Sequence, residues 1–285
     1  MSDAPKVWIN GELLPADEVR VSPFDLGLTV GLGVFETMVA YQGKVFAYDL
    51  HHRRLEASAE VLGIAVPEQE LIEKAMNEVI GQQDIQAGRL RVRVSLSGGS
   101  NALQGGDQQG NLMVSAVTIP VAHDRDLAKL VQVPFTINEH AATSGLKSAS
   151  YADHVLAYRY ALKRGGDEAL MLNTRGEVCE AAMSNLFVVK DGVVKTPALS
   201  SGCLAGVTRE LIIRQCLEHD VPVQECALVE GDVHAADELF LTSSVRELQG
   251  AVLMGDERDQ HDTSGEITRR LSGAYTELVR KELGL

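Results

Sequence analysis

Hydrophobic and polar positions in the first 120 residues predict short strands combined with one amphipathic helix. Apolar segments flank Asn10-Gly11, and both residues of this pair tolerate positive φ, so a hairpin is expected there. Gln42-Gly43 predicts a second hairpin in the same way. From Leu71 to Ile80 apolar residues recur every three or four positions, which is typical of a helix with one buried face. The predicted strands are 7–9, 12–14, 35–41, 44–48, 89–96 and 112–119.

The second half is predicted to begin after a polar break at 123–126. Beyond it, short apolar runs separated by turns predict strands, and three longer periodic stretches predict helices. The strands are expected at 130–137, 169–172, 177–179, 186–189, 193–196 and 238–241, and the helices at about 153–164, 207–219 and 266–283. We therefore predict an α+β protein with a small N-terminal domain (1–120), a linker (121–128) and a larger domain (129–285).

Composition narrows the range of partners. A formal charge of −14 and a pI near 5.0 oppose attraction to nucleic acid or to anionic lipid. The N-terminus lacks a basic segment followed by an apolar run, and no stretch is apolar for long enough to span a bilayer, so we expect a cytoplasmic protein. Neither a metal site nor a redox dithiol is expected, because the cysteines form no C-x-x-C pair; they are Cys179, Cys203, Cys216 and Cys226.

Lys147 and Glu180 are the two residues whose chemistry together indicates a cofactor site. Pyridoxal phosphate needs an amine that forms an imine with its aldehyde. It also needs an anion beside its ring nitrogen, which keeps the ring protonated and electron-withdrawing. Taken singly, each residue also has an ordinary interpretation: most lysines lie on the surface, and a strand-end glutamate is often solvated or paired with an arginine.

Seven short motifs follow one another along the chain. They are Asp25–Gly27, Gly31–Thr37, His51–Leu55, Leu146–Ala157, Gly166–Leu170, Glu177–Glu180 and Asn185–Phe187. In this order they resemble the class IV (fold type IV) pyridoxal-phosphate enzymes, which include branched-chain and D-amino-acid aminotransferases, R-selective amine transaminases and 4-amino-4-deoxychorismate lyases. The resemblance implies a small N-terminal α/β domain, a larger C-terminal domain with a β-barrel-like sheet core that binds the cofactor, and homodimers with sites at the interface.

The same resemblance implies roles for individual residues. Lys147 corresponds to the Schiff-base lysine, and Glu180 to the carboxylate that holds the pyridinium proton. Donors to the cofactor phosphate would be Arg54, Val207, Thr208 and Ser244, with Ser243 as second choice. A guanidinium fork suits phosphate, and Val207 and Thr208 begin a predicted helix, whose free N–H groups attract anions.

Substrate recognition is predicted on the first half of the chain. Arg89, Arg91 and Arg93 alternate on one predicted strand and so share a face, and Arg93 falls where the family has a substrate-carboxylate contact. The alternative is a basic stripe that faces solvent. Phe35, Thr37 and Val245 would line the substrate pocket, while Gly31-x-Gly33 lacks the third glycine of a dinucleotide-binding loop.

Several positions leave the subfamily open. Branched-chain enzymes usually have a tyrosine and an arginine where this chain has Val30 and Val39, and bacterial D-amino-acid enzymes have an Arg and a His that 100–110 lacks. Thr37 agrees instead with the lyases. We predict an aminotransferase that moves an amino group from an amino acid or amine to a 2-oxo acid through Lys147. The alternatives are 4-amino-4-deoxychorismate lyase and, in another class, a noncatalytic ligand-binding relative.

Overall fold

The computed structural model describes residues 5–85, 88–100, 110–120, 126–255 and 264–285, and it divides into two compact units. Unit 1 contains Met1–Val121 together with Lys147–Tyr151. Unit 2 contains Ala122–Leu146 and Ala152–Leu285. Most of the expected linker, 121–125, lies outside the described residues, as does 101–109, on which part of the subfamily comparison rested.

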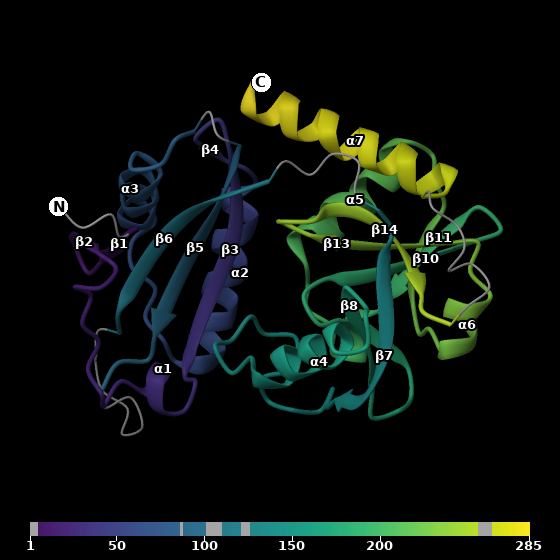
Figure 1. Cartoon of the computed structure of the whole chain (residues 1–285), viewed down its shortest axis with the longest axis horizontal. Helices are drawn as coiled ribbons and strands as arrows, with labels where there is room; N and C mark the ends of the chain where they lie inside the picture. The colour runs from purple at the N-terminus through teal and green to yellow at the C-terminus, as the bar shows by residue number, and fades with distance from the viewer. Residues whose placement is uncertain (1–4, 86–87, 101–109, 121–125, 256–263) are drawn as a thin grey trace. The chain divides into compact units, whose positions relative to one another are not determined.

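Unit 1 is a six-stranded sheet in the order β2-β1-β6-β5-β3-β4 (Figure 1). Its strands are β1 (Lys6–Ile9), β2 (Glu12–Pro15), β3 (Gly33–Tyr41), β4 (Lys44–Val45), β5 (Arg89–Ser97) and β6 (Leu112–Ile119). Its helices are α1 (Leu26–Thr29), α2 (Tyr48–Leu62) and α3 (Gln69–Ile80). Apolar residues of α2 and α3 form one core with the inward residues of β3, β5 and β6, so both helices cover the same face of the sheet.

Both hairpin predictions for unit 1 are confirmed. Asn10 and Gln42 have φ of 49°, and the glycine that follows each also has positive φ, as such tight turns require. The strand expected at 44–48 is wrong in extent, since β4 ends at Val45 and α2 begins at Tyr48. Leu71, expected in the buried stripe of α3, is 39% exposed; the stripe begins at Ile72.

Unit 2 is an eight-stranded sheet in the order β12-β11-β10-β13-β14-β7-β8-β9. The strands are β7 (Ala128–Ile137), β8 (Glu168–Asn173), β9 (Val178–Ala181), β10 (Asn185–Lys190), β11 (Val193–Pro197), β12 (Val223–Cys226), β13 (Glu238–Ser243) and β14 (Glu247–Leu253). β7 runs parallel to β8 and β14, and β11 runs parallel to β12; the other pairs are antiparallel. Buried aliphatic residues from six of these strands form one core of the unit.

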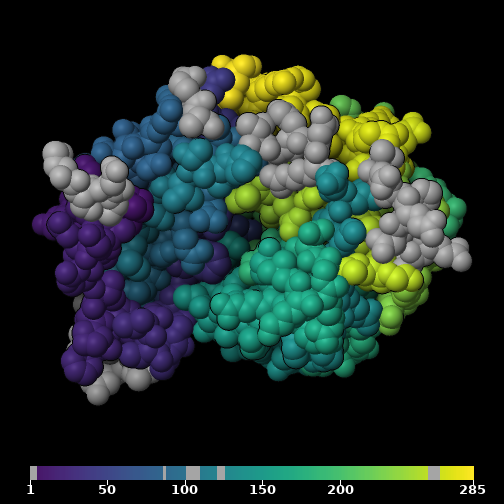
Figure 2. Space-filling view, in the orientation of Figure 1, coloured from purple at the N-terminus to yellow at the C-terminus, as the bar shows by residue number. Residues whose placement is uncertain are grey.

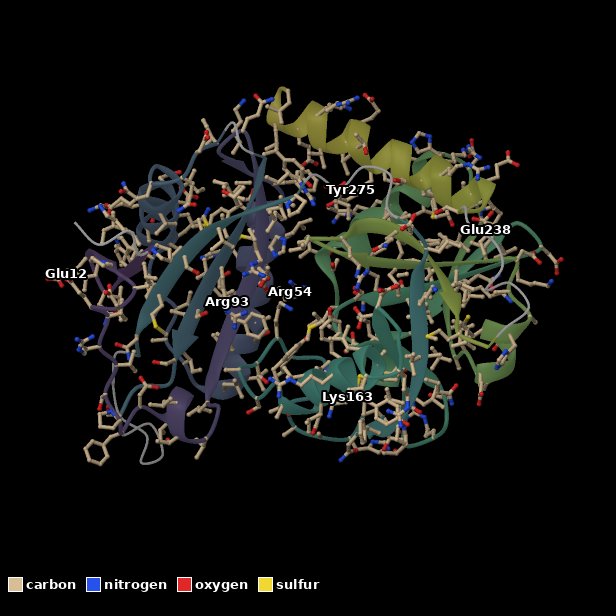
Figure 3. The ribbon with its side chains drawn as sticks, viewed as in Figure 1. Glu12, Arg54, Arg93, Lys163, Glu238 and Tyr275 are labelled. Atoms are coloured by element: carbon tan, nitrogen blue, oxygen red, sulfur yellow. The ribbon has the colours of Figure 1, made fainter. Side chains whose placement is uncertain are left out.

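In the described part of unit 2, four α-helices pack around the sheet, together with the short helix η2 (Leu199–Ser201). They are α4 (Ala152–Leu162), α5 (Val207–Glu218), α6 (Glu230–His234) and α7 (Glu266–Leu283). α4 lies at the surface of unit 2 (Figure 2), and its residue Leu156 is 55% exposed. Glu238 accepts hydrogen bonds from the first N–H groups of α7, and Tyr275 of the same helix is buried (Figure 3). No helix in the described part of the chain is both long and apolar enough to cross a membrane.

Candidate active site

The backbone around Lys147 is held against the beginning of β3. Ser148 forms a β-bridge with Val34, the Phe35 N–H donates to the Lys147 carbonyl at 3.1 Å, and the Ala149 N–H donates to the Gly33 carbonyl at 2.7 Å. A Cβ on Gly33 would lie 2.8 Å from the Leu96 carbonyl oxygen and 3.3 Å from the Ala149 Cβ, so a side chain there would disturb this packing. The backbone of Lys147 is therefore held in a fixed position within unit 1.

Two aromatic rings surround the Lys147 amine. Its Nζ lies 4.6 Å from the centroid of Phe35 and 5.8 Å from that of Tyr151, and the two rings meet edge to face at 5.5 Å. The faces of aromatic rings attract cations, so these rings orient the amine without neutralising it. Phe35, predicted from the sequence as a substrate-pocket residue, thus contacts the predicted lysine.

Arg93 lies next to Phe35 and Thr37, the predicted pocket residues of unit 1. Its guanidinium carbon is 3.8 Å from the Phe35 centroid, and its Cα is the cross-strand partner of Thr37 (Figure 3 labels Arg93 on β5). Burial lowers the pKa of Arg93, and the positive charge of Arg91 lowers it further. A negatively charged ligand would stabilise the charged form of Arg93 and so oppose both effects on its pKa.

The predicted grouping of three arginines is only partly right. Arg91 and Arg93 both have exposed surface, but Arg89 is 4% exposed and donates to the Pro120 carbonyl from Nε (3.2 Å) and Nη2 (2.9 Å). A buried guanidinium needs acceptors, and the end of β6 supplies one. Arg89 is therefore a structural residue, and the basic face is narrower than the alternation indicates.

Arg54, the expected phosphate ligand, belongs to a buried ionic cluster. Its Nε and Nη2 donate to the two oxygens of Glu36 at 2.7 Å each, and His51 Nδ1 lies 2.7 Å from Glu36 Oε2. Burial alone would raise the pKa of Glu36, but Arg54 and His51 outweigh it and lower the pKa to about 2. Burial lowers the pKa of His51, and because an ionised carboxylate can only accept, the His51 Nδ1–H donates to Glu36. The cluster fixes the arginine on α2.

Replacing Glu36 by glutamine is expected to destabilise unit 1 by about 3–5 kcal/mol at pH 7, because Arg54 keeps a largely buried charge without its carboxylate. Trp8 is the single tryptophan, is buried in the unit 1 core and reports urea unfolding by fluorescence. Since the folded pKa of Glu36 lies below its ordinary value of 4.5, its stabilising effect is present above pH 4.5 and is lost as the pH falls toward 2.

The difference in stability between Glu36→Gln and wild type should therefore shrink over that same pH range. Glu56→Gln is the matched control, because Glu56 also pairs with a histidine of α2 but is 54% exposed. Equal stability of the two variants at pH 7 would contradict the role given to Glu36.

Glu180, on β9 of unit 2, has both carboxylate oxygens engaged. Leu204 N–H donates to Oε2 at 3.0 Å and Asn185 Nδ2 at 3.3 Å, while His154 Nε2 lies 3.3 Å from Oε1. The residue is 7% exposed. A carboxylate has about four acceptor positions, so three donors leave about one for a further N–H group. A protonated ring nitrogen fits that position.

Val207 and Thr208 form the first turn of α5, as predicted. Gly206 precedes the helix without a capping side chain, so the first N–H groups of α5 remain for an anion. A Cβ on Gly206 would collide with the Asn185 amide, which itself donates to the Leu204 carbonyl at 2.9 Å. The backbone thus approaches Asn185 closely at the point where the helix begins.

Ser243 is the last residue of β13, and Ser244 and Val245 lie in the turn that follows. Arg246 N–H donates to Ser243 Oγ at 3.2 Å, and Arg246 Nη2 lies 3.2 Å from the fully buried Glu168. β10 and β13 pair so that Asn185 is opposite Thr242, which brings this turn next to the segment after Glu180.

Two hydroxyl groups in these segments are buried without a hydrogen-bond partner among the described residues, namely those of Ser184 and Thr242. Buried polar groups are nearly always paired, so both indicate a place for a polar ligand. Each unit holds groups that suit pyridoxal phosphate: unit 1 has an amine for its aldehyde, and unit 2 has a carboxylate for its ring nitrogen and hydroxyl and N–H donors for its oxygens. Within the described residues, no group of three or more His, Cys, Asp or Glu side chains is arranged to hold a metal ion.

Sequence reasoning missed the residues that support the predicted ones. Glu36 lies within the motif Gly31–Thr37. Strand alternation places its side chain on the apolar face of β3, opposite to the face of Phe35 and Thr37. A charged residue at such a position indicates a buried ion pair. His154 and Asn185 lie in the motifs Leu146–Ala157 and Asn185–Phe187, yet their contact with Glu180 depends on tertiary structure.

Comparison with known proteins identifies the family. Residues 33–253 match the family model described as amino-transferase class IV. A Methanocaldococcus jannaschii protein provisionally named a branched-chain-amino-acid aminotransferase is 30% identical over 97% of each chain. A D-alanine aminotransferase of Listeria monocytogenes is 28% identical over 98% of each chain. The solved branched-chain aminotransferase of Thermoproteus uzoniensis with norvaline has a TM-score of 0.87 and 28% identity, and the match covers 96% of this chain and 94% of that one.

The fold is therefore that of a fold type IV pyridoxal-phosphate enzyme. The chain belongs to the class IV aminotransferase family. Similar solved structures include a branched-chain amino acid aminotransferase with pyridoxamine 5'-phosphate, the aminated form of the same cofactor. The expected fold class, cofactor and aminotransferase activity are confirmed. The lyase alternative is not favoured. The noncatalytic alternative is wrong, because the family and the named relatives indicate an enzyme.

Proposed function

We propose that Lys147 is the catalytic lysine of this aminotransferase and that Glu180 binds the cofactor ring nitrogen. The observation that carries this proposal is the setting of each residue: the Lys147 amine lies against Phe35 and Tyr151, and Glu180 keeps an acceptor position beside three donors. The remaining proposed cofactor ligands are Arg54, Val207, Thr208, Ser243 and Ser244.

The proposed residues differ in their tasks. When bound, pyridoxal phosphate supplies an aldehyde for a covalent link and a ring that withdraws electrons from the substrate Cα. Lys147 would hold the cofactor through its amine, and the same amine would move a proton at the substrate Cα. Glu180 retains the proton of the ring nitrogen through a charge-assisted hydrogen bond. The amino group passes finally to a 2-oxo acid.

We propose that Arg93 binds the substrate carboxylate, with Phe35, Thr37 and Val245 lining the pocket. Arg93→Ala should raise the KM for the amino acid roughly 10- to 100-fold, which corresponds to the loss of a hydrogen bond to a charged group, about 1.5–3 kcal/mol. Arg91→Ala is the control, because Arg91 occupies the same face of β5 and has no hydrogen bond or ion pair among the described residues. A similar KM for both variants would contradict the assignment.

Amino donors provide the test of substrate class. Bound cofactor should lose its visible absorption with amino acids of one handedness, and L-leucine, L-valine and D-alanine cover the substrates in the relatives' names. If no amino acid or simple amine has this effect while 4-amino-4-deoxychorismate yields pyruvate, the aminotransferase assignment is wrong.

We also propose a homodimer that acts in the cytoplasm, with the domain division 1–120, 121–128 and 129–285. The family resemblance supports the dimer. Three of the four unpaired cysteines are buried, as is common in proteins of reducing compartments. Light scattering coupled to size-exclusion chromatography measures the oligomeric state directly.

A further inference from the structure

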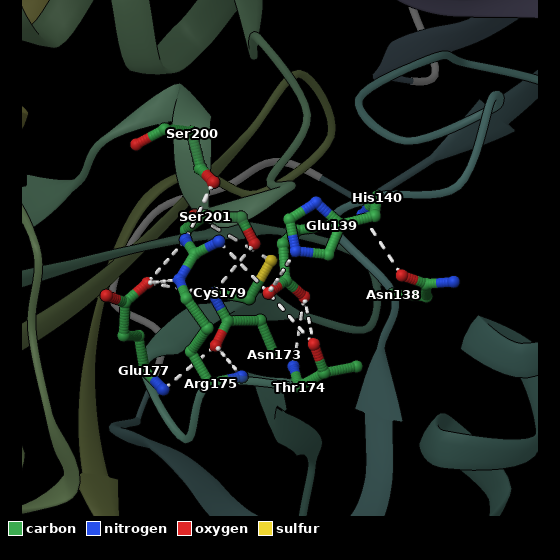
Figure 4. A network of polar contacts seen from close by, with 10 residues as sticks. All are labelled: Asn138, Glu139, His140, Asn173, Thr174, Arg175, Glu177, Cys179, Ser200 and Ser201. Carbon is green, nitrogen blue, oxygen red and sulfur yellow. Dashed lines mark hydrogen bonds and ion pairs between the residues drawn. The ribbon is translucent and has the colours of Figure 1, made fainter.

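A buried carboxylate lies eight residues before Lys147 in the sequence. The side chain of Glu139 is 1% exposed, although it belongs to a loop that follows β7. Figure 4 shows its partners in unit 2: Thr174 donates from its N–H (3.0 Å) and from its hydroxyl (2.9 Å), and Arg175 Nη1 donates at 3.0 Å. Burial raises the pKa of Glu139, but its own backbone N–H together with Thr174 and Arg175 outweighs burial and lowers the pKa to about 2, so the group is an anion. The aminotransferase chemistry proposed above assigns it no task.

The same network reaches a third segment of unit 2. Arg175 Nη2 donates to the Ser200 carbonyl at 2.9 Å, and Asn173 Nδ2 donates to the Ser201 carbonyl at 3.2 Å (Figure 4). Gly202, at φ +94°, is in direct contact with the loop, because a Cβ there would lie 3.0 Å from the Glu139 Cβ and 2.9 Å from the Ser144 hydroxyl. Glu139 thus links the loop before Lys147 to the turn between β8 and β9 and to residues 200–202.

Each linked segment leads directly to a proposed active-site residue. Residues 139–146 run into Lys147, whose own backbone is hydrogen-bonded in unit 1. Residues 200–202 run into Leu204, whose N–H donates to Glu180, and then into the first turn of α5. The turn between β8 and β9 is followed by the strand that carries Glu180. Glu139 therefore anchors, within unit 2, the segment that enters Lys147, while β3 holds the backbone of Lys147 itself in unit 1.

We propose that Glu139 is a positioning residue for Lys147, which fixes the path of residues 139–146 through Thr174 and Arg175. This inference rests on the proposed role of Lys147. Ion-paired and hydrogen-bonded side chains that hold a reactive group in place raise the rate of its reaction by orientation, without contact with the reacting atoms.

Glu139→Gln and Glu177→Gln make a matched pair for the test. Both remove one carboxylate from Arg175, since Glu177 Oε2 accepts from Arg175 Nη2 at 2.7 Å, but only Glu139 belongs to the loop that leads to Lys147. Hydrogen exchange of residues 139–146 in the apoenzyme is the first measurement. Glu139→Gln should accelerate it by at least about tenfold, and Glu177→Gln should leave it unchanged.

The second measurement is the first-order rate of covalent attachment to Lys147 at saturating pyridoxal phosphate, well below the melting temperature. A purely structural role would lower stability and leave this rate unchanged, whereas positioning predicts a decrease of about tenfold or more in Glu139→Gln alone. Equal behaviour of the two variants in both measurements overturns the proposal. If Glu139→Gln does not fold, Thr174→Val removes one donor to the same carboxylate and must show the same two effects in smaller measure.

Borohydride trapping separates this proposal from the one on which it rests. If wild-type protein is not labelled at Lys147, the role of Lys147 itself is wrong. If wild type is labelled there and Glu139→Gln is labelled at the wild-type rate, only the positioning role is wrong.

Discussion

Lys147→Ala is expected to abolish the covalent attachment of pyridoxal phosphate and to lower turnover by roughly 10⁴-fold or more, because the variant loses the amine that we propose both holds the cofactor and moves the Cα proton. The rings of Phe35 and Tyr151, which contact the amine in wild type, are unchanged in this variant, so the loss is that of the amine alone. Visible absorption spectra after addition of cofactor, together with steady-state rates, provide the measurement.

Lys163→Ala is the control for this result. Lys163 is an exposed lysine of unit 2 next to the end of α4 (Figure 3), and its removal should change neither the spectrum nor the rate. Borohydride reduction followed by peptide mapping should place the label on Lys147 in wild type and in Lys163→Ala. A label on another lysine, or an active Lys147→Ala enzyme, would refute the assignment.

Local sequence patterns were sufficient for most elements of the fold. Helix α7 spans the predicted 266–283, and both hairpins turn at the predicted residues, because turn chemistry and helical periodicity are local properties. The errors occur where tertiary contacts override local pattern. Leu71 continues the apolar period of α3 but lies beyond the covered stripe, and Arg89 continues the alternation of β5 but is buried against the end of β6.

In the proposed site, too, local pattern predicts some residues and tertiary contacts determine the others. Lys147, Glu180 and the start of α5 stand in recognisable motifs, so single residues could be named from the sequence. Their supports could not, because each joins residues distant in the chain: Glu36 meets Arg54 across 18 positions, Glu180 meets His154 across 26, and Glu139 meets Arg175 across 36. A motif identifies the reactive group, and the residues that orient it become visible only when the chain has folded.

Glu180→Gln should leave the cofactor bound but slow proton abstraction roughly 10²- to 10³-fold, comparable to the loss of one preorganised electrostatic contact of about 2.7–4 kcal/mol. A neutral amide does not hold a proton on the ring nitrogen, so the ring withdraws fewer electrons from Cα. Stopped-flow measurement of the half-reaction with a preferred amino donor gives the rate of this step, and cofactor affinity is measured separately by titration.

The size of the effect depends on what remains around residue 180. Leu204 N–H and Asn185 Nδ2 can still donate to the glutamine oxygen, so the fold of this segment should persist and the loss should be chemical. Glu177→Gln, three residues earlier, is the control, because that carboxylate pairs with Arg175 and has no proposed contact with the cofactor. Wild-type rates in Glu180→Gln, or equal slowing in both variants, would show that Glu180 does not act on the ring nitrogen.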